Sequence, residues 1–190
     1  MIFKSKLTMK QFDFGGDNIT KSAQATIVKD SSGAVFREPC LEDGSEVWKL
    51  IKETGVLDLN SSYSYLMWCS YFNDTSIIIE SNEKVVGFVS GFVKPSSPNR
   101  LFIWQVAVAE SERGKGFASK MLHHLLKRNS CEGIEYIETT ISPSNIASQK
   151  LFQGLARDLK TDIKVSECFS TNDFPEKGHE DELMHQIGPF

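Results

Sequence analysis

The stretch WQVAVAESERGKGFASKML, residues 104–122, decides the fold. It starts as a β-rich run and passes through a charged bend, after which Gly114 and Gly116 lead into apolar residues at helical spacing. A helix starting there has unpartnered N–H groups in its first turn and a dipole that favours an anion. Glycine lets an anion approach the backbone closely. The stretch predicts a phosphate-binding strand–loop–helix unit or, alternatively, a plain tight turn.

The residues around this stretch predict an α/β domain with a mixed sheet. A turn is expected at 96–99, between two strands. The expected strands are 34–39, 75–81, 84–93, 101–109, 133–142, 162–169 and 182–188, and the expected helices are 41–55, 60–71, 117–127 and 145–159.

Length and composition favour one domain with a real core. The chain has 190 residues, of which 40% are hydrophobic and 24% charged. We expect the domain to span 33–190, after an extension (1–32) that is loosely ordered or partly appended for expression. The net charge of −4 argues against a nucleic-acid partner. No apolar run approaches the roughly 20 residues that span a bilayer, and a secretory signal is not evident, so we expect a cytoplasmic protein.

The metal-binding residue types are scattered. The four cysteines are far apart without a C-x-x-C pair, which favours reduced thiols. His123 and His124 are adjacent and so point to different faces of a helix. The sequence predicts no metal site.

Residues 113–118 and 142–156 form two blocks that resemble the GNAT-type N-acetyltransferase superfamily. The Walker pattern is absent, and Ser119 interrupts a dinucleotide pattern. Instead, residues 113–118, RGKGFA, match the acyl-CoA signature [QR]-x-x-G-x-[GA] of that superfamily. Residues 142–156, SPSNIASQKLFQGLA, resemble its pantetheine-contacting segment. The resemblance implies a GNAT fold, whose mixed, mostly antiparallel sheet of about seven strands is flanked by about four helices, and acetyl-CoA as cosubstrate.

The resemblance also implies which residues bind acetyl-CoA. The strand at 101–109 splays from the next strand and offers its backbone to pantetheine. The Val106 N–H is expected to polarise the thioester carbonyl, a contribution of roughly 3 kcal/mol. Phe152 stands where many members have a tyrosine that protonates the leaving thiolate, so no general acid is assigned. The expected acetyl-CoA-binding residues are Val106, Ala107, Val108, Arg113, Gly114, Lys115, Gly116, Phe117, Ala118, Asn145 and Phe152.

The acceptor amine must lose a proton before it attacks. An alkyl ammonium group titrates near 10.4, so a base or a water chain is needed. Glu138, Glu80 and Glu182 are the candidates, and the sequence does not choose among them.

Three longer blocks resemble the L-2,4-diaminobutyrate acetyltransferases of ectoine biosynthesis. They are GVLDLNSSYSYL (55–66), FVSGFVKPSSPNRLFIWQVAV (88–108) and GHEDELMHQI (178–187). The resemblance implies transfer of acetyl to the 4-amino group of L-2,4-diaminobutyrate, and a homodimer. A GNAT enzyme for another amine and a non-catalytic acyl-CoA sensor are the alternatives.

A diamino acid needs a site with groups of both signs. Asp58 can hold an ammonium group, Asn60 and Ser61 with the following helix amides can hold the carboxylate, and Trp104 can form a wall. Asp58 and Ser61 can equally be helix caps, Trp104 core, and the acidic C-terminal segment a solvated face. The expected acceptor residues are Asp58, Asn60, Ser61, Tyr63, Trp104, His179, Glu180 and Glu182.

Overall fold

The computed structural model describes residues 27–175 and 177–190. The predicted extension at 1–32 therefore lies mostly outside the described residues. Its end is described, and there β1 (Val28–Lys29) pairs antiparallel with β2 (Val35–Arg37). The sheet thus begins before residue 33, where we had placed the domain boundary, because a tight turn folds this short strand back onto β2.

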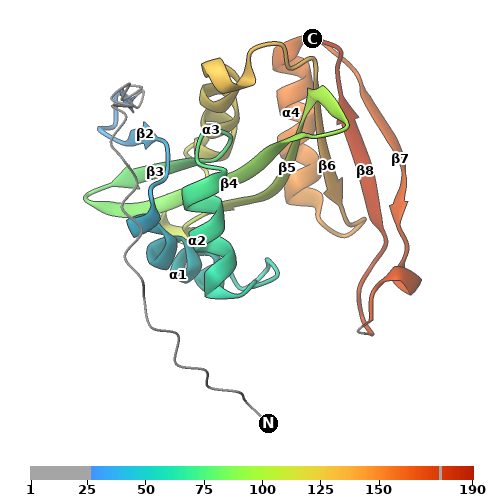
Figure 1. The fold of residues 1–190 in the computed structure, drawn as a ribbon, viewed down its shortest axis with the longest axis horizontal. Helices are drawn as coiled ribbons and strands as arrows, with labels where there is room; N and C mark the ends of the chain where they lie inside the picture. The colour runs from blue at the N-terminus through green and yellow to red at the C-terminus, as the bar shows by residue number, and fades with distance from the viewer. Residues whose placement is uncertain (1–26, 176) are drawn as a thin grey trace, which may run out of the picture.

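One mixed sheet of eight strands runs through these residues in the order β1-β2-β3-β4-β5-β6-β8-β7 (Figure 1). Neighbouring strands are antiparallel except β5 and β6, which are parallel. The fold class is confirmed, with β1 as the unpredicted strand. The turn expected at 96–99 is tighter than predicted, since β5 already begins at Ser97. The remaining strands are β3 (Ile77–Ser81), β4 (Lys84–Lys94), β5 (Ser97–Val108), β6 (Tyr136–Ile141), β7 (Ile163–Phe169) and β8 (Glu182–Ile187).

Four α-helices cover the two faces of the sheet. α1 (Gly44–Thr54) and α2 (Ser62–Tyr71) pack on one face, and α3 (Phe117–Leu126) and α4 (Ile146–Leu159) on the other. Along β3 the side chains alternate between these two cores, since Ile77 and Ile79 join the α3–α4 side and Ile78 the α1–α2 side. No helix in the described part of the chain is long and apolar enough to cross a membrane.

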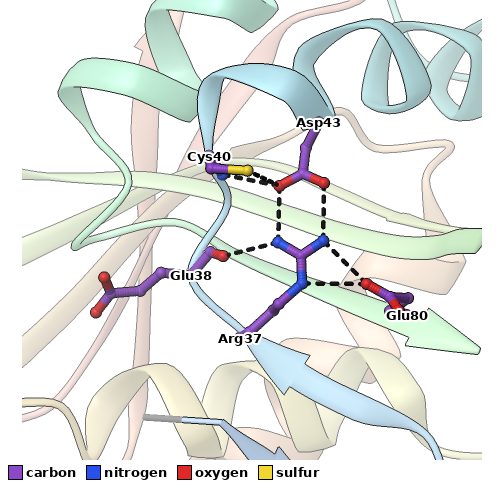
Figure 2. Close-up of polar contacts among 5 residues, drawn as sticks. All are labelled: Arg37, Glu38, Cys40, Asp43 and Glu80. Atoms are coloured by element: carbon purple, nitrogen blue, oxygen red, sulfur yellow. Dashed lines mark hydrogen bonds and ion pairs between the residues drawn. The ribbon is translucent and has the colours of Figure 1, made fainter. Parts of the chain in front are cut away.

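The first helices are tied to the sheet by a cluster of charged residues (Figure 2). Arg37, at the end of β2, donates to both carboxylate oxygens of Asp43 at 2.7 and 2.8 Å and to Glu80 of β3 at 3.0 and 3.1 Å. Asp43 also accepts the Cys40 N–H at 2.8 Å. Glu80 is therefore an ion-pair partner of Arg37, and it is not among the residues that line the cavity described below.

The strands β5 and β6 stay together over a short distance. Their parallel pairing is confined to residues 100–102 and 136–138. Beyond it β5 continues along β4 to Val108, and β6 continues along β8 to Ile141. The splay expected between these strands is therefore present, and it opens the middle of the sheet.

Candidate active site

A cavity of about 550 Å³ opens where β5 and β6 separate. Segments from the loop before α2, from β5, from β6 and the start of α4, and from the loop before β8 line it. It brings together many of the predicted site residues, although they are far apart in the sequence. The predicted residues in its lining are Asp58, Asn60, Trp104, Val106, Asn145, Phe152, His179, Glu180 and Glu182.

The open edge of β5 offers backbone groups to this gap. The Gln105 N–H donates to the Ser90 hydroxyl at 3.2 Å and the Ala109 N–H to the Val86 carbonyl at 2.8 Å, both on the β4 side. Because backbone groups alternate along a strand, the N–H groups of Val106 and Val108 point away from β4. Val106 is thus oriented as predicted. The alternation directs the main chain of Ala107 toward Phe88 of β4, which corrects its assignment to pantetheine.

The glycine loop forms an open backbone corner at the start of α3. Gly114 and Gly116 have φ of +80° and +74°, a left-handed region that glycine adopts without strain. A Cβ at either position would meet nothing within 4 Å, so packing does not demand a glycine there. The first intrahelical bond runs from the Lys120 N–H to the Gly116 carbonyl, which leaves the amides at 117–119 for an anion.

Charged side chains flank this corner. Arg113 and Lys115 are exposed, and Lys115 pairs with Glu112 at 2.8 Å. Phe117 is buried in the core, so its backbone is the part available to a ligand, whereas Ala118 is half-buried.

Asn145 and Phe152 lie on the β6 side of the gap. The Asn145 carboxamide oxygen accepts the Ser148 N–H at 3.0 Å and so caps α4. Phe152 is buried about two helical turns after Asn145 on the same helix. Asn145 therefore has a structural role that the sequence analysis did not consider, and its place in the cavity lining agrees with the predicted ligand contact.

Carboxylates gather on the acceptor side of the cavity. Glu182 of β8 is half-buried, and this burial raises its pKa above the usual glutamate range. The negative charges of Asp58 and Glu180 raise it further, against a hydrogen bond from Thr140 and the charge of His179. Glu180 is held by the Ser144 N–H at 3.1 Å and by the Ser144 hydroxyl. The site is suited to a cationic ligand and contains a carboxylate of increased basicity.

Glu138 is not a plausible base, although we had named it as a candidate. Burial would raise its pKa, but hydrogen bonds from Lys94, Gln186 and Arg100 outweigh burial and lower the pKa of this carboxyl below its usual range. It also faces a separate, smaller cavity of about 240 Å³. Glu138 is a structural centre that holds β4, β5, β6 and β8 together.

Two predicted acceptor residues lie outside the cavity lining. Ser61 is the N-cap of α2 and accepts the Ser64 N–H at 3.4 Å, the alternative role we had considered for it. Tyr63 is 68% exposed on the first turn of α2. Neither Ser61 nor Tyr63 lines the cavity of the single chain.

Sequence reasoning missed several lining residues, the polar side chains of β6 in particular. Thr139 and Thr140 line the gap, as does Phe174, on which His179 stacks at 4.4 Å between ring centroids. Alternation along β6 indicates at most one of the two threonines, because adjacent residues of a strand face opposite sides of the sheet. The loop before β8 lines the cavity through His179 and Glu180, which were expected there, and through Phe174 and Gly178, which were not.

Trp104 forms part of the opposite wall. It is 42% exposed and packs on Trp68 of α2 with 5.0 Å between ring centroids. The Trp104 side chain is thus partly buried against α2 and partly exposed.

Within residues 27–175 and 177–190 no three His, Cys, Asp or Glu residues gather as metal ligands.

Comparisons with known proteins agree with this geometry. Residues 45–156 match the acetyltransferase (GNAT) family. The chain is 52% identical to an L-2,4-diaminobutyric acid acetyltransferase of Virgibacillus pantothenticus, over 80% of this chain and 96% of that protein. It is 49% identical to the enzyme of the same name from Marinococcus halophilus, over 82% of this chain and 90% of that protein.

A solved structure is similar as well. Diaminobutyrate acetyltransferase EctA from Paenibacillus lautus, in complex with its substrate L-2,4-diaminobutyric acid and coenzyme A, superposes with a TM-score of 0.80. It is 46% identical in sequence, over 82% of this chain and 95% of that chain. The separated strands, the glycine corner and these similarities together lead to one conclusion: the chain belongs to the acetyltransferase (GNAT) family.

Proposed function

We propose that this protein transfers acetyl from acetyl-CoA to the 4-amino group of L-2,4-diaminobutyrate, giving the N4-acetyl precursor of ectoine. The observation that carries the proposal is the cavity between β5 and β6, which joins an open strand edge to a cluster of carboxylates. The names of relatives about 50% identical in sequence support both the reaction and the substrate.

The residues fit acetyl-CoA at two places. The unpaired amides at 117–119 and the open corner at Gly114 and Gly116 suit the pyrophosphate, with Arg113 and Lys115 adding positive charge. The outward backbone groups of Val106 and Val108 suit the pantetheine arm, as do Asn145 and Phe152 across the gap.

The acceptor half fits a diamino acid. Asp58, Glu180 and Glu182 would hold its two ammonium groups, and Trp104 would enclose its methylene chain. Asn60 and the N-terminus of α2 would hold the carboxylate, and Ser61, Tyr63 and His179 remain proposed contacts around them. With the carboxylate anchored there, the 2-amino group lies beside the anchor, and the 4-amino group extends toward the thioester.

The chemistry follows from these positions as direct attack in a ternary complex. Glu182, whose pKa is raised by burial, accepts a proton from the 4-ammonium group, directly or through water. The neutral amine attacks the thioester carbonyl, and the Val106 N–H stabilises the charge that develops on the oxygen. Phe152 has no proton to give, so the leaving group departs as a thiolate, and the proton that the nitrogen loses as the amide forms passes to water or to this thiolate.

Two further features of the protein belong to the proposal. β7 is an edge strand that exposes Val165 and Phe169, by 51% and 49%, and a second copy covering this face would make a homodimer. The four cysteines are unpaired, in keeping with a reducing cytoplasm. Light scattering that reports a monomer would contradict the dimer and leave the reaction untouched.

Steady-state CoA release tests the reaction. The panel is L-2,4-diaminobutyrate, ornithine, lysine, putrescine and spermidine, with the position of the product acetyl group assigned by NMR. We expect a strong preference for diaminobutyrate and acetylation at its 4-amino group. If only another amine is acetylated, the protein is an acetyltransferase, but the assignment of diaminobutyrate as its acceptor is wrong. Binding of acetyl-CoA without any turnover would instead indicate a sensor.

A further inference from the structure

Gln105 has a buried oxygen that the rest of the protein leaves unpaired. The residue is 6% exposed and lines the cavity beside Val106. Its Oε1 is buried and has no hydrogen-bond partner among residues 27–175 and 177–190. Such atoms are rare in folded proteins, because a buried polar atom without a partner costs free energy. Ser76 Oγ is the other one in the described residues.

The orientation of the Gln105 carboxamide is fixed by its other end. Nε2 donates to the main-chain carbonyl of Asp58 at 2.9 Å. A carbonyl oxygen only accepts hydrogen bonds, so the nitrogen must face Asp58, and Oε1 must face the other way. Gln105 therefore ties the loop that carries Asp58 to β5, and its own Oε1 is a buried acceptor without a partner in a residue that lines the cavity.

A β-bulge places this side chain on the acceptor side. Ser90 of β4 pairs with Gln105 and Gly91 with Ile103, which leaves Trp104 as the extra residue of β5. A bulge interrupts the alternation, so Trp104 and Gln105 both point toward α2 and the loop that carries Asp58. Val106 resumes the alternation and packs against the α3 side.

The charged residues that line the same cavity as Gln105 indicate the kind of ligand. The charged groups that line this part of the cavity are the carboxylates of Asp58, Glu180 and Glu182, with His179 near them. A carboxamide oxygen adds an acceptor in a fixed position without adding a fourth negative charge. The matching ligand group is an ammonium with several N–H donors.

We propose that Gln105 is a specificity-determining residue, whose Oε1 accepts a hydrogen bond from the ammonium group of the acceptor that does not react. The inference rests on the proposed function, in which that group is the 2-ammonium of L-2,4-diaminobutyrate. The bond to the Asp58 carbonyl makes the Asp58 loop and Oε1 one anchor. Such an anchor selects diamino acids over monoamines, since a monoamine leaves Oε1 unpaired.

Calorimetry on the CoA-loaded protein tests this contact with two ligands, L-2,4-diaminobutyrate and 4-aminobutyrate. The second lacks the 2-amino group but keeps the carboxylate and the 4-amino group. Gln105→Met removes the oxygen at similar volume and should weaken diaminobutyrate binding about tenfold, or about 1.4 kcal/mol. Binding of 4-aminobutyrate should change by less than about twofold, because that ligand never makes the bond.

Two companion variants separate the roles of the side chain. Gln105→Glu keeps an oxygen toward the cavity but faces the Asp58 carbonyl with a second one. It should lower thermal stability and still discriminate between the two ligands. Ser76→Ala removes the other unpaired buried oxygen, which lies outside the cavity lining, and should leave both affinities unchanged.

The outcomes are distinguishable. If Gln105→Met weakens both ligands equally, Gln105 only positions the Asp58 loop, and the proposed contact is wrong. If it weakens neither, water satisfies Oε1, and the proposal is again wrong. If the wild-type protein acetylates diaminobutyrate in either case, the proposed function stands without this inference. If the wild-type protein neither binds nor acetylates diaminobutyrate, both the proposed function and the inference about Gln105 are wrong.

Discussion

At the scale of single residues, the surroundings of each side chain distinguish the three carboxylates that the sequence suggested as general bases. Glu80 and Glu138 are engaged by cations, whereas Glu182 is half-buried among other acids. Sequence alone could not separate them, because a pKa depends on neighbours that the fold brings from distant segments. Their spacing along the chain carries no such information.

Glu182→Gln should lower kcat/KM by about 10²-fold or more if the carboxylate is the general base. A base works in its deprotonated form, so wild-type kcat/KM should rise with pH through the raised pKa of Glu182, above the ordinary value of about 4.3. The variant should lose this rise. Measured pH profiles check it, with Glu132→Gln in an exposed turn outside the cavity lining as a control. An unchanged profile in the Glu182 variant would assign the base elsewhere.

Gly116→Val should raise the KM for acetyl-CoA at least about tenfold and leave the KM for the amine nearly unchanged. The added Cβ meets no protein atom, so it stands in the space left for the phosphate. A side chain at φ of +74° also costs about 1–2 kcal/mol of stability. Gly133→Val, at φ of +81° and equally open, carries the same strain away from the site. Equal KM values in the two variants would reject the phosphate corner.

At the scale of elements, the sequence predicted most of the fold correctly. Helical spacing in 117–127 and β-rich runs such as 84–93 are local signals that report directly on burial. β1 was missed because two residues give no periodicity. The bulge at Trp104 was missed because it is defined by the register with β4, which no local pattern encodes. The elements were therefore predictable, and the irregularity that aims Gln105 was not.

The alternation along β5 predicts a pattern of amide hydrogen exchange. Adding CoA should slow exchange at Val106 and Val108, whose N–H groups face the gap. Exchange at Gln105 and Ala109 should change little, because their N–H groups already donate to β4. Residue-resolved NMR exchange checks this. Protection at all four amides would indicate closure of the whole sheet instead of pairing with the cosubstrate.

The Arg37–Asp43 pair makes the attachment of α1 depend on pH. Burial would raise the pKa of Asp43, but hydrogen bonds from Arg37 and Cys40 outweigh it and lower the pKa. The folded value is thus below the unfolded value of about 3.9, so the contribution is present above about pH 4 and lost as pH falls through the folded pKa.

Asp43→Asn should therefore lower the free energy of unfolding by about 2–4 kcal/mol at pH 7, since it leaves Arg37 poorly paired. The difference from wild type should shrink below pH 4. Urea denaturation at several pH values measures it, and Glu46→Gln, in an exposed pair with Lys49, is the control. A pH-independent difference would show that packing, not charge, is lost.

At the scale of the whole molecule, the active cavity exists because the sheet is incomplete. The chain supplies an acidic wall from its C-terminal strands and an open backbone edge from its middle, and the two meet only in three dimensions. The acyl-CoA signature was predictable because it is local. The resemblance of residues 178–187 indicated His179 and Glu180 as site residues, but the position of their loop against the cavity depends on how β8 inserts between β6 and β7.

The short β5–β6 ladder also links the lifetime of the protein to its metabolic supply. Only three residues on each strand pair β5 with β6, and this pairing joins the β1–β5 half of the sheet to the β6–β8–β7 half. We therefore expect local opening of the sheet to begin there. A cosubstrate that bridges the gap stabilises the closed state, by about 2.7 kcal/mol at a hundred times its Kd. It therefore lowers the population of opened molecules. Proteases cleave opened chains. We therefore expect the enzyme to be degraded more slowly when acetyl-CoA is abundant and to be cleared first when carbon is scarce.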